Sequence, residues 1–144
     1  TAGSFAIGIN DSGIVAGYQA RVVNGSSVAA KLFVYDTSTD TLNFPSDFFL
    51  SSNTFPRDIN NNGIIVGDAE VDARQNPRPR AAFMYDIAKA EFTDLNTLIA
   101  CDSPYIIVSA NSINDNNEIL ADAVLVKTQR NILGERVLGL PKSK

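Results

Sequence analysis

The chain has 144 residues, a length that fits one domain or part of one. Its 12 basic and 16 acidic side chains give a net charge of -4, which argues against non-specific binding to nucleic acid. Because there is no histidine and only one cysteine, the sequence excludes Ser-His and Cys-His catalytic units and an intrachain disulfide, and it predicts no cofactor and no metal site.

The first part of the chain predicts four strands joined by polar turns. Apolar residues alternate in its opening segment, which is typical of a strand with one buried face. The turn Asn10-Asp11-Ser12-Gly13 follows, since Asn and Asp bond their own backbone and Gly accepts a positive φ. A second polar turn begins at Asp36. The predicted strands are Phe5–Ile9, Ile14–Tyr18, Ala30–Tyr35 and Thr41–Phe44.

The same plan recurs twice along the chain. The second set of predicted strands is Phe55–Ile59, Ile64–Asp68, Ala81–Tyr85 and Glu91–Asp94. One helical turn is expected in Leu95–Ala100. The third set is Tyr105–Ile113, Glu118–Val126 and Arg136–Leu140.

An internal repeat supports this reading. Residues 9–18 read INDSGIVAGY, residues 59–68 read INNNGIIVGD, and residues 113–122 read INDNNEILAD. The asparagines Asn10, Asn60 and Asn114 are spaced 50 and then 54 residues apart. Phe33 and Phe83 each lie 23 residues after their asparagine, and the same count places Val137 in the third copy. The sequence therefore predicts repeats at 4–50, 51–99 and 104–141.

Four-stranded units of this length are typical of β-propeller blades. We therefore predict an all-β fold of three antiparallel four-stranded repeat units, arranged as a partial propeller within one repeat domain, or a fragment of one, over 1–144. Three blades cannot close a ring, so exposed strand edges predict self-association. A β-sandwich is the alternative.

The pattern I-N-x-x-G-x-(I/V)-(V/A)-G followed by an A-F-(L/M)-(Y/W) strand resembles the HAF-type bacterial extracellular repeat family. Asp94-Leu95-Asn96-Thr97-Leu98-Ile99 is similar to that family's linker between blades. Lys31 and Ala81 stand near the place of the namesake histidine, and Asn117 replaces the turn glycine of the third copy. The resemblance implies a propeller-like fold, an extracellular, periplasmic or cell-surface location, and no catalytic residues.

The loop at 72–80 departs from the repeat pattern and is the candidate partner-binding site. It carries Arg74, Arg78 and Arg80 on an otherwise acidic chain. Guanidinium groups suit carboxylate or phosphate groups, so we expect contact with an acidic protein or glycan partner. A solvated hairpin loop is the competing interpretation. Phe48-Phe49-Leu50, between the first two repeats, is expected to cover a sheet edge or meet a partner.

The remaining acidic and amide groups have structural interpretations. The asparagine-rich turns lack the spaced carboxylates of a calcium loop and are predicted to be hairpin turns. Asp36 and Asp86 each start a polar turn, where a capping role is expected. Asp58, Asp68 and Asp122 lie near strand ends and are the candidates for an acid pair.

Two functions follow from these patterns. The first is a non-catalytic structural or binding module of an exported bacterial protein, and therefore not an enzyme. The alternative is a fragment of a carboxylate-dependent glycan hydrolase or lyase. The chain shows no signal peptide and no run of about 18 apolar residues, so no membrane span is expected.

Overall fold

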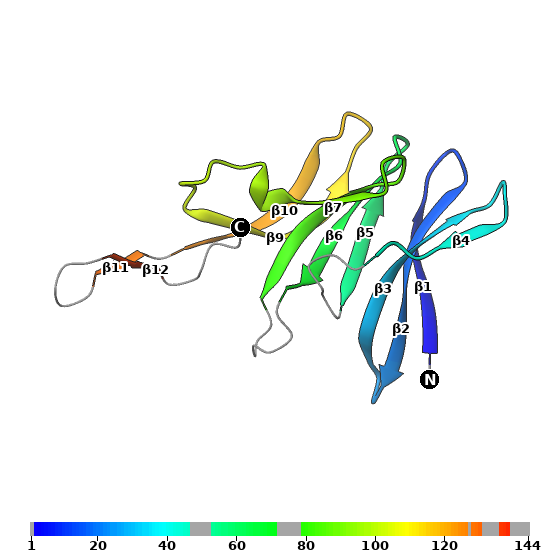
Figure 1. The fold of residues 1–144 in the computed structure, drawn as a ribbon, viewed down its shortest axis with the longest axis horizontal. Helices are drawn as coiled ribbons and strands as arrows, with labels where there is room; N and C mark the ends of the chain where they lie inside the picture. Colours follow the sequence, from blue (N-terminus) through cyan, green and yellow to red (C-terminus); the bar gives the residue numbers. More distant parts are fainter. Residues whose placement is uncertain (1, 47–52, 72–78, 127, 131–135, 139–144) are drawn as a thin grey trace.

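A computed structural model of the chain describes residues 2–46, 53–71, 79–126, 128–130 and 136–138. Over these residues the fold is all-β, as predicted, and the strands pair antiparallel throughout (Figure 1). The predicted helical turn is a short 3-10 helix, η2 (Leu95–Thr97). Phe48-Phe49-Leu50 lies outside the described residues.

Two four-stranded sheets and two two-stranded sheets make up the described structure. The first sheet has the order β1-β2-β3-β4, and its strands are β1 (Ala2–Ile9), β2 (Ile14–Val23), β3 (Ser26–Asp36) and β4 (Thr41–Asn43). The second sheet has the order β5-β6-β7-β8, and its strands are β5 (Thr54–Ile59), β6 (Ile64–Glu70), β7 (Arg80–Asp86) and β8 (Glu91–Asp94). The third sheet pairs β9 (Tyr105–Ile113) with β10 (Ile119–Leu125).

The third repeat differs from the prediction of a four-stranded unit. Its expected third strand, β12 (Arg136–Leu138), pairs with β11 (Thr128–Arg130) and not with β10. Pairing with a segment a few residues away closes a short loop, and a short apolar run carries little information about register. The third sheet therefore has two strands among the described residues.

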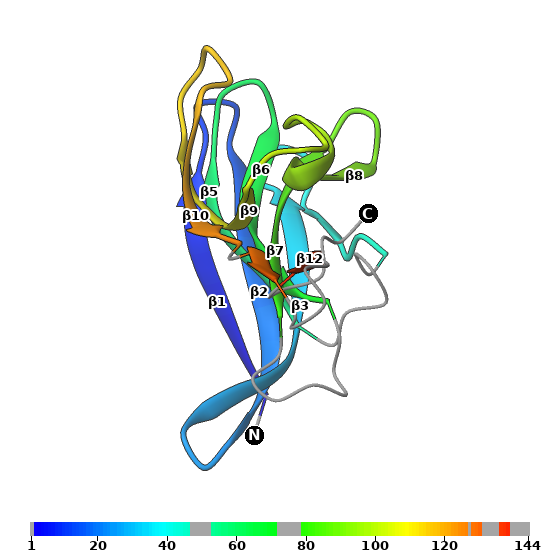
Figure 2. The ribbon, with the colours of Figure 1, turned by 90° about the vertical axis from the view of Figure 1, so that its left-hand side faces the viewer.

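The first three sheets stack face to face in chain order (Figures 1 and 2). Ala16, Leu32 and Val34 of the first sheet form one apolar cluster with residues of the second sheet that include Ile65 and Phe83. A second cluster joins the opposite side of the second sheet to the third sheet, with members Val66, Ala82, Leu95, Ala110 and Ile113. Because side chains alternate along a strand, the second sheet is covered on both sides. Over the described residues these three sheets form a row of three layers that does not close into a ring.

The repeated asparagine turns lie next to one another and link the sheets. In each turn the asparagine Oδ1 accepts hydrogen bonds from the second and fourth residues after it; for Asn10 the donors are the backbone N–H groups of Ser12 and Ile14. The free Nδ2 of Asn10 donates to the backbone oxygen of Asn60 at 3.1 Å. Asn60 Nδ2 in turn donates to the backbone oxygen of Asn114 at 3.0 Å. The predicted turns are confirmed, and they also act as an inter-sheet ladder.

A second row of contacts runs beside this ladder at the next position of each turn. The backbone N–H of Asp11 donates to Asn61 Oδ1 at 2.7 Å, and the N–H of Asn61 donates to Asp115 Oδ1 at 2.9 Å. Asn61 Nδ2 also donates to a carboxylate oxygen of both aspartates. The amide of Asn61 therefore separates two negative charges that occupy equivalent positions on either side of it.

The linker between the second and third sheets is held by side chains of the segment that carried the family resemblance. Asp94 Oδ1 accepts from the N–H and the Nδ2 of Asn96. Asn96 then pairs with Ile107 as a strand neighbour would: its Nδ2 donates to the Ile107 oxygen, and its Oδ1 accepts from the Ile107 N–H. This pairing positions β9 against the second sheet.

Candidate functional site

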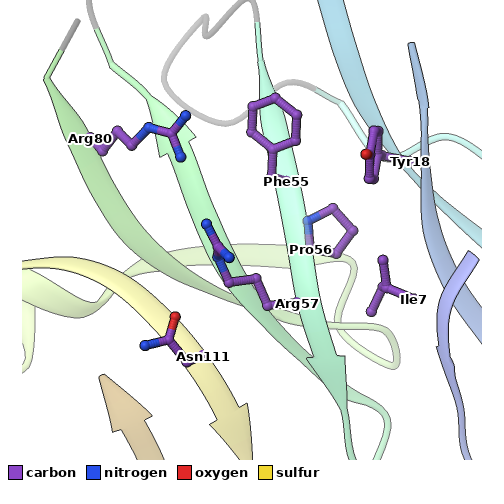
Figure 3. A pocket seen from close by; sticks show the side chains of 7 residues that line it. All are labelled: Ile7, Tyr18, Phe55, Pro56, Arg57, Arg80 and Asn111. Atoms are coloured by element: carbon purple, nitrogen blue, oxygen red, sulfur yellow. The ribbon is translucent and has the colours of Figure 1, made fainter. Parts of the chain in front are cut away.

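A cleft of about 530 Å³ opens where the three stacked sheets meet. Its lining combines two arginines with apolar, aromatic and amide side chains, and Figure 3 shows them around the opening. The lining residues are Ile7 from β1, Tyr18 from β2, Phe55, Pro56 and Arg57 from β5, Arg80 from β7 and Asn111 from β9. The cleft therefore exists only when the repeats are stacked. Below we call it the two-arginine cleft.

A buried carboxylate fixes the two arginines. Asp68, in β6, has a side chain that is 0% exposed, and it forms ion pairs with Arg57 through Oδ1 and with Arg80 through Oδ2. Ser109 of the third sheet adds a longer hydrogen bond to Asp68 Oδ1 at 3.4 Å. Two short charge-assisted bonds satisfy a carboxylate that burial alone would strongly destabilise. Each arginine is restricted in its position, because its guanidinium group is paired with the buried carboxylate of Asp68.

Both guanidinium groups still reach solvent. The Arg57 and Arg80 side chains are 42% and 41% exposed. A guanidinium has five N–H donors in a fixed fork, and Arg57 uses its Nε for Asp68 whereas Arg80 uses Nη1. Arg80 Nη2 also lies 3.8 Å from Glu70 Oε1. The described residues that line the cleft include these donors and no carboxylate, and the side chain of Asp68 is fully buried.

Two aromatic rings, with Ile7 and Pro56, form the apolar part of the cleft. The Arg80 guanidinium lies over the Phe55 ring, 5.5 Å from its centroid. Tyr18 meets Phe55 edge to face, and it also stacks on Phe5 with the two ring centroids 5.0 Å apart. Such a surface, with a few polar groups, is typical of small-ligand sites.

The structure brings one of the three predicted partner-binding arginines into this cleft. Arg80 lines it, whereas Arg74 and Arg78 lie outside the described residues. The sequence reasoning missed Arg57. A signal was present, because Asp68 follows the apolar run Ile64–Val66 inside a strand, and a charge buried in a strand requires a partner of opposite charge.

The three candidate acids do not form a pair in the cleft. Asp58 Oδ2 accepts from the Ser112 hydroxyl and the Ile113 N–H, both at 2.8 Å, and so joins β5 to β9. Asp122 Oδ2 accepts from Asn111 Nδ2 at 2.8 Å. Asp68 is held by its arginines. Each carboxylate has a structural partner of its own.

The repeated turn aspartates cap their turns, as predicted. Asp36 Oδ1 accepts from the Ser38 hydroxyl and N–H, and these bonds hold the pKa of Asp36 below its ordinary value. Asp86 Oδ1 accepts from the Lys89 N–H at 3.2 Å. Within the described ranges, no three acidic or cysteine side chains gather as metal ligands would.

Comparison with known proteins gives one family. The model of a family described as protein of unknown function (DUF3466) matches residues 1–140. No curated protein and no solved structure matches the chain. The match does not confirm the resemblance to HAF-type repeats. In the part of the chain that the structure describes, no helix is long and apolar enough to cross a membrane.

Proposed function

The chain belongs to this family of unknown function, and we propose that it is a non-catalytic binding module of an exported bacterial protein. In this proposal the stacked sheets are propeller-like blades that act as a scaffold, and the two-arginine cleft binds an acidic glycan. The observation that carries it is the buried Asp68, which holds Arg57 and Arg80 at the same opening. Export and the propeller relationship are supported by the resemblance to extracellular repeats.

The shape and chemistry of the cleft favour a sugar acid as the bound unit. A carboxylate can accept two parallel N–H bonds from one guanidinium. The less polar face of a sugar ring fits against Phe55 and Tyr18, whose rings already meet edge to face. Because both arginines are held in place before binding, little side-chain freedom is lost when the ligand arrives.

The glycan hydrolase or lyase alternative would need two carboxylates in one cleft. Among the described residues, none of Asp58, Asp68 and Asp122 lines the two-arginine cleft. No specific contact favours this second function, so the binding proposal is the one we develop.

Calorimetric titration with oligogalacturonate, and with neutral galactose oligomers of the same length, tests the proposal. We expect the acidic oligomer to bind and the neutral one to bind at least tenfold more weakly. Arg57→Gln should weaken binding about tenfold, the scale of one charge-assisted hydrogen bond. Arg21→Gln is the matched control, since Arg21 is exposed on β2 and does not line the cleft.

Equal affinity for both oligomers, or an unchanged affinity in Arg57→Gln, would contradict the binding proposal. New reducing ends or unsaturated products after incubation with the acidic oligomer would support the enzyme alternative. Circular dichroism must first show that Arg57→Gln keeps its strands, because the substitution removes one of the two partners of Asp68.

A further inference from the structure

One side of the first sheet carries apolar and aromatic residues at the same repeat positions as a surface that is buried elsewhere in the molecule. Ala16 points to the second sheet, so its strand neighbour Val15 points away. Ile9 pairs with Val15, Val15 pairs with Tyr35, and Tyr35 pairs with Leu42, so these four share the outer side. We call Ile9, Val15, Tyr35 and Leu42 the head face.

The second sheet has an equivalent head face, and it is covered. Ile59 and Ile65 occupy the positions of Ile9 and Val15 in the repeat and pack against the first sheet. Ile59 is 8% exposed, whereas Ile9 is 63% exposed. The same residue type at the same repeat position is therefore buried where a preceding sheet exists and open where none is described.

The third sheet presents the complementary surface at the other end. The residue six positions after the repeated turn asparagine is Ala16 in the first repeat and Val66 in the second. Both are fully buried against the next sheet. In the third repeat this position is Leu120, which is 68% exposed. We call the outer side of β10 around Leu120 the tail face.

The row of hydrogen bonds between the asparagine turns also ends at the third sheet. Asn10 and Asn60 each donate from Nδ2 to the backbone oxygen of the equivalent asparagine in the following repeat. Asn114 Nδ2 instead donates to Glu118 Oε2 within its own turn, at 2.6 Å. At the opposite end, the backbone oxygen of Asn10 accepts from the Gly13 N–H. The oxygen of Asn60 accepts both from its own turn and from the preceding asparagine.

We propose that the tail face of one chain binds the head face of a second copy, head to tail. Asn114 Nδ2 then turns from Glu118 to the Asn10 oxygen of the second copy, and Leu120 covers its Ile9. This contact repeats, between chains, the two sheet-to-sheet contacts within the chain. Two copies stack six sheets, which lies within the range of about four to eight blades of closed propellers.

The contact would have a limited area and one unfavourable pair. Among the described residues the third sheet supplies only β9 and β10, so the tail face covers only part of the head face. Within the chain Asn61 donates to both Asp11 and Asp115, whereas at the junction between copies Asp115 meets another Asp11. The like charges weaken this association, which is therefore expected to depend on concentration.

This unfavourable pair gives a specific test. Asp11→Asn places at the junction the same amide that Asn61 provides between the first two sheets. Removing a pair of like charges at directly opposed positions should tighten association by on the order of twofold to fivefold. Asp102→Asn is the matched control, because Asp102 is exposed and lies outside both faces.

A charge-swap experiment separates head-to-tail stacking from pairing at strand edges. Ile9→Lys and Leu120→Glu change exposed side chains on opposite faces, so both variants should fold. Sedimentation velocity should show concentration-dependent dimers or larger species for the wild type and loss of them for each variant alone. In a mixture, Lys at position 9 meets Glu at position 120, and the other junction keeps its wild-type residues, so association should return.

Two outcomes overturn the proposal. A wild-type chain that stays monomeric at the highest attainable concentration assigns the two faces to another protein or segment. Association that persists in both variants, or that fails to return on mixing, shows that the copies meet elsewhere, for example along the edge of β10.

Discussion

Asn10 and Asn60 hold the same position in successive repeats, and the side chain of the first donates to the backbone oxygen of the second at 3.1 Å. The same side chain accepts two backbone N–H groups of its own turn through Oδ1. One amide thus closes a hairpin turn with its oxygen and joins two sheets with its nitrogen. Neither an aspartate, which lacks the donor, nor a serine, which is too short, can do both.

The ladder predicts a large effect for Asn60→Ala. Asn60 is buried, and the substitution removes the acceptor of the Asn62 and Ile64 N–H groups. It also removes the donor to the Asn114 oxygen, which keeps only the N–H of its own turn. We expect a loss of about 1–3 kcal/mol in the free energy of unfolding, measured by urea denaturation. Asn114→Ala, at an exposed turn, is the control and should cost less. Equal losses would show that the turn bonds matter and the inter-sheet bonds do not.

The clamp on Asp68 predicts a second large effect. Asp68→Asn keeps the shape of the side chain but removes the charge that pairs with Arg57 and Arg80. We expect a loss of about 3 kcal/mol, the lower end for breaking a buried ion pair, because both guanidinium groups can reach water. Asp122→Asn, at the equivalent position of the third repeat, is exposed and should change stability little. A neutral result for Asp68→Asn would contradict the clamp.

Two glycines predict different tolerance to alanine. A Cβ at Gly67 would overlap the backbone oxygen of Phe55, so one strand must shift, and Gly67→Ala should cost about 1–3 kcal/mol as overpacking does. Gly25 has a positive φ of 78° but open space around it, so Gly25→Ala should cost about 1–2 kcal/mol from backbone strain alone. Thermal unfolding of the two variants compares them. No loss for Gly67→Ala would be inconsistent with this close approach.

Two aspartates predict a loss of stability in acid. The Asn61 backbone and side-chain N–H groups lower the pKa of Asp115, and the Ser38 hydroxyl and N–H lower the pKa of Asp36, both from 3.8. Since the unfolded chain takes up these protons first, the stabilisation is complete above pH 3.8 and is lost as pH falls through the lower folded pKa values. Urea denaturation from pH 6 downward should show this loss. Asp115→Asn should make it shallower, and an unchanged slope would contradict the assignment.

Much of the local structure could be predicted from the sequence, because it depends on short-range rules. The third copy of the repeat predicted a strand at Tyr105–Ile113, which are the bounds that β9 has. The Asn-x-x-Gly turns were predicted because their side chains bond their own backbone, and Gly13 takes the expected positive φ of 77°. In the first sheet β2 and β3 run further than predicted, since Asn24 and Gly25 both take positive φ and make a tight hairpin turn.

The pairing of the third repeat and the cleft could not be predicted in the same way. Arg136–Leu138 keeps its place in the repeat count, yet it pairs with β11, because a short apolar run does not specify its partner strand. The contact between Arg57 and Asp68 joins residues 11 positions apart, and the cleft adds residues of all three sheets. Of the described residues that line the cleft, only Arg80 was a predicted partner-binding residue, and it was predicted as part of the loop at 72–80.

The sequence by itself determined the repeat, the strands within it, the turns between them and the chemistries that a chain without histidine excludes. These follow from composition, alternation and the preferences of Asn and Gly, which act over a few residues. The tertiary structure alone decided which faces are covered and where Arg57 and Arg80 meet. Stacking joins repeats 50 residues apart, and only that packing leaves Ile9 exposed while Ile59 is buried.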